Sequence, residues 1–126
     1  MSESTLSPDL RRFILARITS VPLLEALLLL RTRVAGWELS EITSRLYVSE
    51  SVAADLVDEL VRQGLAQRDA TFARYMPMPP ELAAIVDELA TVYARHLVQV
   101  TQLIHSSTEQ KAHRFADAFM IRKDPR

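Results

Sequence analysis

The segment from Trp37 to Leu65 constrains the fold of this chain more than any other part of the sequence. Apolar residues recur at helical spacing on both sides of the tripeptide Tyr47-Val48-Ser49, and Ser49 is a favourable N-cap for the helix that follows. Gly64 stands where that second helix should end. The pattern predicts two short helices joined by a tight turn, the first of them between Glu38 and Leu46.

The residues after Gly64 are expected to form a small two-stranded hairpin. Residues 65–68 and 72–76 have the residue types of short strands, and Asp69-Ala70-Thr71 between them suits a turn. Three prolines between positions 77 and 80 then close this unit.

Helices are predicted on both sides of this unit. Ser7-Pro8-Asp9 and Ser20-Val21-Pro22 have the capping serine and early proline of helix starts. The second of these helices is apolar almost all round, which predicts a place in the core. From Glu81 to about His105 neither glycine nor proline intervenes, and apolar residues step by three and four. At about 1.5 Å per residue, this run predicts a continuous rod of roughly 37 Å.

The composition indicates one packed domain. The chain has 126 residues, of which 48% are hydrophobic and 25% charged, a balance that suits a globular core rather than disorder. It has no cysteine, so disulfides and thiolate zinc sites are excluded. No apolar stretch approaches the roughly 20 residues that span a bilayer, and the first residues lack the layout of a signal peptide. We therefore expect a soluble, cytoplasmic protein.

Charge is unevenly distributed along the chain, although 15 basic and 16 acidic residues give a net charge of only −1. The segment 37–64 has two arginines against six acidic residues, a local charge of −4. A strongly basic balance would favour a polyanionic partner. This chain provides no such signal, and its acidic residues gather in the two predicted short helices.

No arrangement of residues in the sequence indicates catalysis, a metal site or a cofactor. The chain has only two glycines, which excludes a glycine-rich phosphate loop. His96, His105 and His113 are nine and eight residues apart, so no two of them have the i, i+4 spacing of a helical metal pair. The adjacent acids Asp58-Glu59 and Asp87-Glu88 point roughly 100° apart on a helix and do not form a carboxylate dyad. An enzyme is not expected.

The stretch from Glu38 to Arg68 resembles the winged helix-turn-helix core of bacterial transcriptional regulators, most closely the MarR type. The order of the flanking segments agrees with this resemblance, since helices precede the motif and a long helix follows it. The matching residues are Leu39-Ser40-Glu41-Ile42, Leu46, Ser49, Leu56-Val57-Asp58, Leu60 and Gly64-Leu65.

The resemblance implies a mostly α, single winged-helix domain over residues 1–126. N-terminal helices at 7–36 would precede a helix-turn-helix and a small two-stranded wing at 37–76. C-terminal helices at 80–121, the first of them long, would follow and pair two copies of the chain.

The resemblance also implies a DNA-binding transcriptional regulator whose partner is double-stranded DNA. In MarR-type proteins the second helix of the motif enters the major groove, and the wing contacts the phosphate backbone. Carried over by position, the reading face here consists of Ser49, Glu50, Ser51, Ala54 and Asp55, with Asp58 further along the helix. The basic residues that would hold phosphates are Arg45, Arg62, Arg68 and Arg74.

The reading face departs from the family pattern in its charge. Family members usually place lysine or arginine at several of these positions, whereas this chain has Glu50, Asp55 and Glu59. Acids close to phosphates oppose the counterion release that supports DNA affinity. The alternative hypothesis is therefore a winged-helix module for protein–protein interaction or dimerisation that does not bind DNA. A third hypothesis is a small apolar effector bound between the long helix and the winged core, where helix junctions often leave pockets.

Tyr47 is a second departure from the family pattern. Many helix-turn-helix turns have glycine at this point, because the chain there adopts a positive φ that strains other residues. Either the turn has another shape in this chain or Tyr47 packs over it.

The long predicted helix has an apolar surface that is wider than one face. A helix projecting from a small domain rarely leaves such a surface exposed. Pairing with a second copy would cover it, and we expect a homodimer; the alternative is a helix folded back on the N-terminal helices. The expected interface residues are Leu89, Tyr93, Leu97, Val100, Ile104, Phe115 and Phe119.

Overall fold

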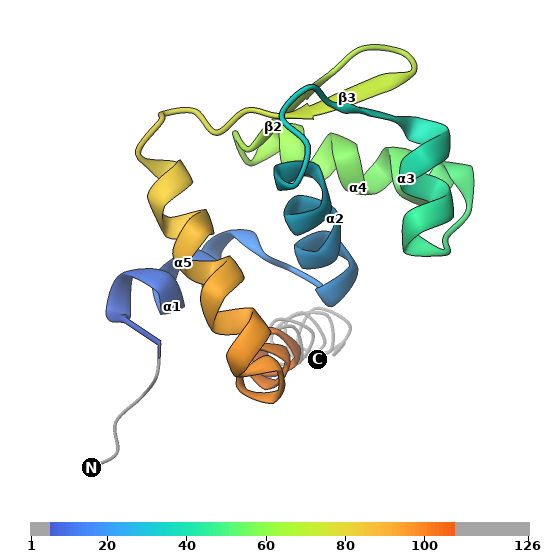
Figure 1. Ribbon diagram of the computed structural model, residues 1–126. Coiled ribbons are helices and arrows are strands. Elements are labelled where there is room, and N and C mark those ends of the chain that lie inside the picture. Colours follow the sequence, from blue (N-terminus) through green and yellow to red (C-terminus); the bar gives the residue numbers. More distant parts are fainter. Residues whose placement is uncertain (1–5, 108–126) are drawn as a thin grey trace, which may run out of the picture.

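The computed structural model describes residues 6–107. Its helices are α1 (Pro8–Arg17), α2 (Val21–Arg31), α3 (Leu39–Leu46), α4 (Glu50–Arg62) and α5 (Leu82–Arg95), and a further helical stretch covers residues 97–107. Its strands are β1 (Trp37–Glu38), β2 (Ala66–Arg68) and β3 (Phe72–Tyr75). The described part is mostly helical with a small antiparallel sheet, which is compatible with a winged-helix arrangement (Figure 1).

Side chains at the helix starts satisfy backbone N–H groups that lack a partner within the helix. Ser7, Ser20 and Ser49 each accept a hydrogen bond from the backbone N–H three residues ahead, at the starts of α1, α2 and α4. α3 begins differently, because the Glu41 side chain reaches back to accept from the backbone N–H of Glu38 at 3.0 Å. The predicted helix starts are therefore confirmed, each with the cap that its sequence supplies.

The sheet has the strand order β1-β3-β2, and both of its strand pairs are antiparallel. In the β2–β3 hairpin, Ala66 lies opposite Tyr75 and Arg68 lies opposite Ala73. β1 adds Trp37 on the other side of Ala73. The two-stranded hairpin expected from the sequence is thus confirmed. β1 is a third strand that the sequence did not predict, and it anchors the chain directly before α3.

The leucine-rich helix α2 lies at the centre of the core, as its composition predicts. α3, α4 and β3 all pack against it. Leu24, Leu27 and Leu30 of α2 are fully buried, and so are Val57 and Leu60 on the inner side of α4. α4 therefore lies with its aliphatic side on the core and its polar side open to solvent.

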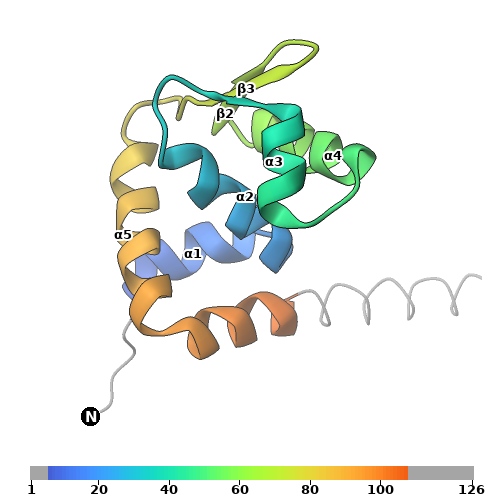
Figure 2. The ribbon, with the colours of Figure 1, turned by 45° about the vertical axis from the view of Figure 1, so that its right-hand side comes forward.

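The continuous rod predicted from Glu81 to His105 is wrong. α5 ends at Arg95, and His96 leaves helical geometry with φ −132° and ψ 52°. Residues 97–107 resume as a helix that turns away from α5 and runs beneath α1 toward the start of α2 (Figure 2). The turn carries Val100 and Ile104 into the core, where they are 0% and 1% exposed. For this part of the chain, the folded-back alternative is correct.

Burial explains why the helix turns although neither glycine nor proline interrupts it. Fully burying a side chain such as Val100 or Ile104 contributes about 1.5–3 kcal/mol. Each backbone hydrogen bond lost at the interruption costs about 0.5–1.5 kcal/mol, because water takes over the freed groups. The two buried side chains outweigh the interrupted helix, and this balance is not visible in a local sequence pattern.

Candidate functional site

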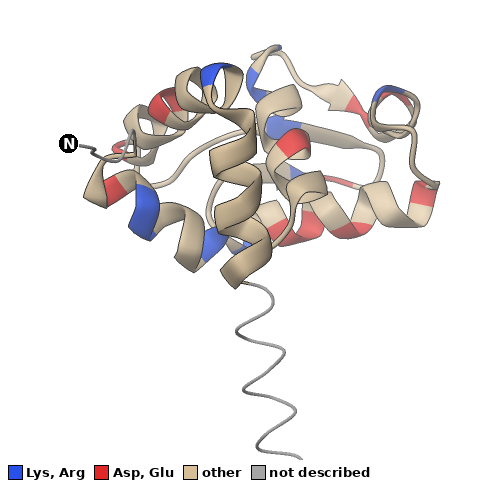
Figure 3. Ribbon diagram, turned by 90° about the horizontal axis from the view of Figure 1, so that it is seen from below, with Lys and Arg blue, Asp and Glu red and all other residues tan. Residues whose placement is uncertain are grey.

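The outer side of α4 carries the residues from which the reading face was predicted. The structure brings these residues together on one surface, since the inner side of the same helix is held on the core. Acidic positions mark the ribbon of α4 along its length (Figure 3). Ser49, Glu50, Ser51 and Asp55 are exposed, and Ala54 and Asp58 are half-buried.

Arg68, which the sequence assigns to a DNA phosphate, points back into its own chain. Its Nη1 donates to Asp58 Oδ1 at 3.0 Å. Its Nε donates to the carbonyl of Asp69 at 2.9 Å, and its Nη2 donates to that of Ala70 at 3.2 Å. The side chain is only 21% exposed. The guanidinium therefore ties the hairpin turn to α4, and a phosphate would have to displace these bonds.

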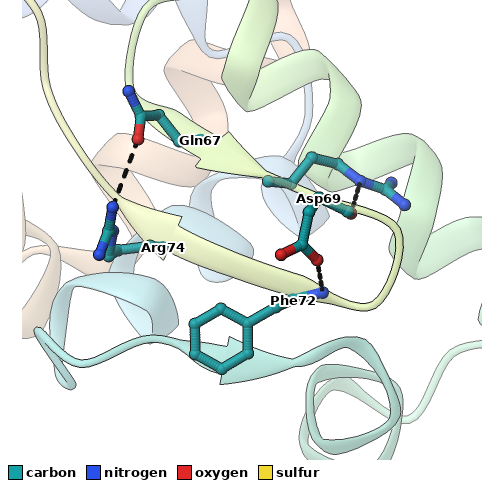
Figure 4. A pocket seen from close by; sticks show the side chains of 5 residues that line it. Gln67, Asp69, Phe72 and Arg74 are labelled. Carbon is teal, nitrogen blue, oxygen red and sulfur yellow. Dashed lines mark hydrogen bonds between the residues drawn. The ribbon is translucent and has the colours of Figure 1, made fainter.

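The other predicted phosphate ligands differ in their availability. Arg62 is paired with Glu59 of its own helix, with Nε 2.9 Å from Oε1. Hydrogen bonds from Gln63 and then from Arg62 lower the pKa of Glu59 below its ordinary value. Arg74 lies on the exposed side of β3, and its Nη2 approaches Gln67 Oε1 at 3.5 Å across the hairpin (Figure 4). Of these two arginines, Arg74 is the one free to meet an external anion.

Arg45 takes part in a stack that the sequence did not predict. The guanidinium of Arg33 lies 3.7 Å from the centroid of the Trp37 ring, and that of Arg45 lies 5.1 Å from it. Trp37 itself is 2% exposed, as expected of a core residue. Arg33 also pairs with Glu41 at 3.1 Å, and the pKa of Glu41 is lowered first by the backbone N–H of Glu38 and then by Arg33. The only feature of the sequence that could have indicated this stack is that Arg33 and Arg45 stand on either side of Trp37.

A groove of about 490 Å³ lies between the starts of α3 and α4 and the hairpin turn. It occupies the place at which the resemblance puts a nucleic acid. Two carboxylates, Glu38 and Glu50, line it, and the arginine in its wall, Arg68, is held by Asp58. The remaining lining residues are Leu39, Ser40, Ser51, Ala54, Ala70 and Thr71. The groove therefore offers acceptors and hydroxyls rather than available positive charge.

Tyr47 adopts the left-handed conformation at the turn between α3 and α4, with φ 58° and ψ 46°. Its side chain is 93% exposed, so it does not pack over the turn. The turn has the backbone shape for which glycine is usual, and the tyrosine tolerates it. A small hollow of about 110 Å³ lies beside it, lined by Val21, Pro22, Glu25, Leu46, Val48 and Leu56. This hollow lies between α2, α3 and α4, and not between α5 and the winged core, where the small apolar effector was expected.

Three residues expected in a dimer interface are buried within the single chain. Leu89 and Val100 are 0% exposed and Ile104 is 1% exposed, so assigning them to an interface was wrong. They fill the core because residues 97–107 fold back. Tyr93 is half-buried, and its hydroxyl donates to Glu25 Oε2 at 3.1 Å. Leu97 is 53% exposed, while Phe115 and Phe119 lie outside the described residues.

Neither a metal-binding cluster nor a membrane-spanning helix is found between residues 6 and 107. No group of three or more His, Cys, Asp or Glu residues in this range could hold a metal ion. No single described helix is long and apolar enough to cross a membrane. α1 and α2 reach that length only as a pair, and they are bent by 111° relative to each other.

A scan against protein-family models and a search of curated proteins both find no match to this sequence. The similarity to MarR-type regulators therefore stays a resemblance of motifs.

Proposed function

We propose that this chain is a winged-helix protein that acts in the cytoplasm through protein–protein contact rather than by reading DNA on its own. In this proposal α3 and α4 form the helix-turn-helix and the β2–β3 hairpin forms the wing. The observation that carries the proposal is the contact between Arg68 and Asp58, which neutralises the wing's inner cation while Glu50 and Asp55 remain exposed on α4.

The electrostatic argument is a comparison of available charges. Specific DNA-binding proteins make about six to ten phosphate contacts when their binding is steeply salt-dependent. In the described helix-turn-helix and hairpin, Arg45 and Arg74 are the arginines without a carboxylate within ion-pair distance. Glu50 and Asp55 would face the duplex and repel it. Two cations against two acids do not provide the counterion release that holds a protein on DNA.

The groove indicates the chemistry of a protein partner. Glu38 directly before α3 and Glu50 at the start of α4 both line it, together with the hydroxyl groups of Ser40, Ser51 and Thr71. Carboxylates bind arginine and lysine side chains through charge-assisted hydrogen bonds. The partner that fits is a polypeptide segment that presents basic side chains to the start of α4.

Charge reversal on α4 tests the proposal. Wild-type protein should not change the fluorescence anisotropy of a labelled mixed-sequence duplex, even at about 50 mM salt, where electrostatic attraction is strong. Glu50→Lys/Asp55→Lys should bind the duplex, and its affinity should fall steeply towards about 200 mM salt. Asp9→Lys/Glu81→Lys has the same net charge but carries the reversal on exposed positions away from α4, and it should stay inactive. Salt-dependent binding by the wild type would overturn the proposal.

The same variants test the partner directly. Immobilised wild-type protein and the Asp9→Lys/Glu81→Lys control should retain the same partner from cell extract. Glu50→Lys/Asp55→Lys should lose it, because the basic segment would meet like charge. Retention of that partner by all three baits would show that the acidic face is not the contact surface.

A DNA-binding regulator acting as a homodimer is the second candidate. The observation that favours it is that Arg45 on α3 and Arg74 on β3 are exposed, as are Ser49 and Ser51 at the start of α4. If the wild type does bind duplex DNA, Arg74→Ala should weaken binding and reduce the salt slope by about one. Arg68→Ala should have a smaller effect on the slope, since its donors are already engaged within the chain.

A further inference from the structure

An apolar surface surrounds the turn between α3 and α4, on the side away from the acidic groove. It consists of Tyr47 and its neighbours Leu46 and Val48, of Val52 and Leu56 on one face of α4, and of Val21 and Pro22 at the start of α2. We call it the turn surface. Tyr47 is 93% and Val52 is 41% exposed, and the hollow of about 110 Å³ lies within this surface.

The turn surface has features of a contact site. Tyrosine combines a large apolar ring with a polar end, and such residues are enriched where proteins bind. Tyr47 is also held in a backbone conformation that costs about 1–2 kcal/mol for a residue with a side chain. A strained residue that packs against nothing in the described part of the chain gives no stability in return. The exposed ring therefore fits a function in binding.

The chemistry around the turn surface defines its occupant. Glu25 lines the hollow, and Asp55 lies three residues after Val52, next to it on the helix. The surface thus has an apolar centre with carboxylates at its edge. A complementary segment needs apolar side chains three and four residues apart and basic side chains beside them.

Residues 111–123 of this chain have that pattern. Phe115, Phe119 and Met120 are spaced by four and one, and Ala112 and Ala116 extend the same apolar set. Basic residues lie on both sides of them in the sequence, namely Lys111, Arg114, Arg122 and Lys123.

The described chain ends close to the turn surface. Figures 1 and 2 both show the helix of residues 97–107 ending beneath the start of α2, which contributes Val21 and Pro22 to the surface. Phe115 follows Ser107 by eight residues, which span up to about 27 Å when extended. A tether this short holds a segment at an effective concentration on the order of millimolar. The segment of the same molecule therefore outcompetes that of a second copy.

We infer that residues 111–123 dock on the turn surface of their own chain, with Phe115 and Phe119 against Tyr47 and the hollow and the basic residues near Glu25 and Asp55. The hollow and the acidic groove have no lining residue in common, although Asp55 on α4 borders the turn surface and also belongs to the acidic face. The inference rests on the packing of Phe115 and Phe119 and not on the proposed function. A partner that binds at the turn must displace this segment first.

Thiol reactivity tests the docking, because the chain has no cysteine of its own. In the full-length protein, Val52→Cys should react with a maleimide about tenfold more slowly than in the Phe115→Asp/Phe119→Asp background, since the probe reacts only when the segment is undocked. Val34→Cys, 81% exposed beyond the opposite end of α2, should react equally fast in both backgrounds. Phe115→Ala/Phe119→Ala should give an intermediate rate at Val52→Cys.

Two results would overturn the inference. Equal rates at Val52→Cys in the unmodified and substituted backgrounds would mean that the segment does not cover the surface. Protection that increases with protein concentration would mean that a second copy supplies the segment, since intramolecular docking does not depend on concentration. Circular dichroism of each variant establishes that the described helices remain folded during the measurement.

Discussion

At the scale of single residues, Arg68 and Tyr47 determine which charge and which apolar group the predicted DNA-reading unit exposes. Arg68 is turned inward by Asp58 and two backbone carbonyls, and its guanidinium holds the hairpin to α4. Tyr47 does the opposite, since it occupies a glycine-like conformation and leaves its ring in solvent. Neither behaviour follows from residue type alone.

Replacing Tyr47 in the Phe115→Asp/Phe119→Asp background, in which residues 111–123 do not cover the ring, tests the strain at the turn. Tyr47→Gly should raise the free energy of unfolding by about 0.5–1 kcal/mol, because the relief of left-handed strain exceeds the added entropy of the unfolded glycine. Tyr47→Ala should be close to neutral, since alanine keeps the Cβ and the lost ring is exposed. Urea unfolding measures both values. A lower midpoint for the glycine variant would show that the ring contributes stability in the native protein.

The lowered pKa of Glu41 predicts how the free energy of unfolding depends on pH. The pKa of Glu41 is lowered in the folded protein from its ordinary 4.5, by the backbone N–H of Glu38 and then by Arg33. The unfolded chain therefore takes up a proton at higher pH than the folded chain, and the contribution of Glu41 is present above pH 4.5 and is lost as pH falls through the folded pKa. Glu41→Gln should flatten this acid dependence in urea unfolding series. An unchanged slope would contradict the role of this carboxylate.

At the scale of elements, the chain is interrupted at His96 and forms two helices that both pack on the core, instead of the straight rod that the apolar spacing predicts. α5 packs against α1, and residues 97–107 turn beneath it. The same apolar residues that favoured pairing with a second copy are used to complete one chain's own core. An apolar stripe therefore predicts burial, but not the partner that provides it.

A matched pair of leucine and isoleucine truncations tests this turn. Ile104→Ala should lower the free energy of unfolding by about 2–5 kcal/mol, because it leaves a cavity in the core. Leu97→Ala, on the same helix but 53% exposed, should change it by less than about 0.5 kcal/mol. Chemical denaturation of both variants makes the comparison. Similar small effects would mean that the helix of residues 97–107 does not pack on the core in solution.

At the scale of the whole molecule, charge is segregated although the net charge is only −1. Acidic residues line the exposed side of α4, whereas the arginines of the same unit are mostly engaged with neighbouring acids or with Trp37. The resulting surface suits a basic polypeptide better than a polyanion. This distribution, rather than the order of helices, is what separates the two candidate functions.

A homodimer stays a prediction, and Leu89, Val100 and Ile104 cannot belong to its interface because they are buried within the single chain. Leu97 and Val98 are 53% and 63% exposed, and they are the large apolar side chains that the helix of residues 97–107 offers to a second copy. Sedimentation should give about twice the chain mass of 14.3 kDa for the wild type, and 14.3 kDa for Leu97→Asp/Val98→Asp with its helical content intact. A wild type that sediments as a single chain at every concentration would exclude the dimer.

Local features of the sequence were enough to predict most of the elements. Serine caps, early prolines and the apolar spacing predicted α1 to α4, and alternating residue types around Asp69 predicted the hairpin. These signals act within a few residues, so the chain expresses them wherever it folds. The burial of α2 and the outward polar side of α4 followed from the same periodicity.

The tertiary structure alone decided how different elements of the chain contact one another. The contact of Arg68 with Asp58, the stacking of Arg33 and Arg45 on Trp37, the third strand β1 and the turn at His96 each depend on segments that meet only after folding. Burial acts through space, and its contribution of about 1.5–3 kcal/mol for each apolar side chain overrides a local preference of similar or smaller size. The sequence determined the elements of this protein, while long-range packing determined which side chains remained available for a partner.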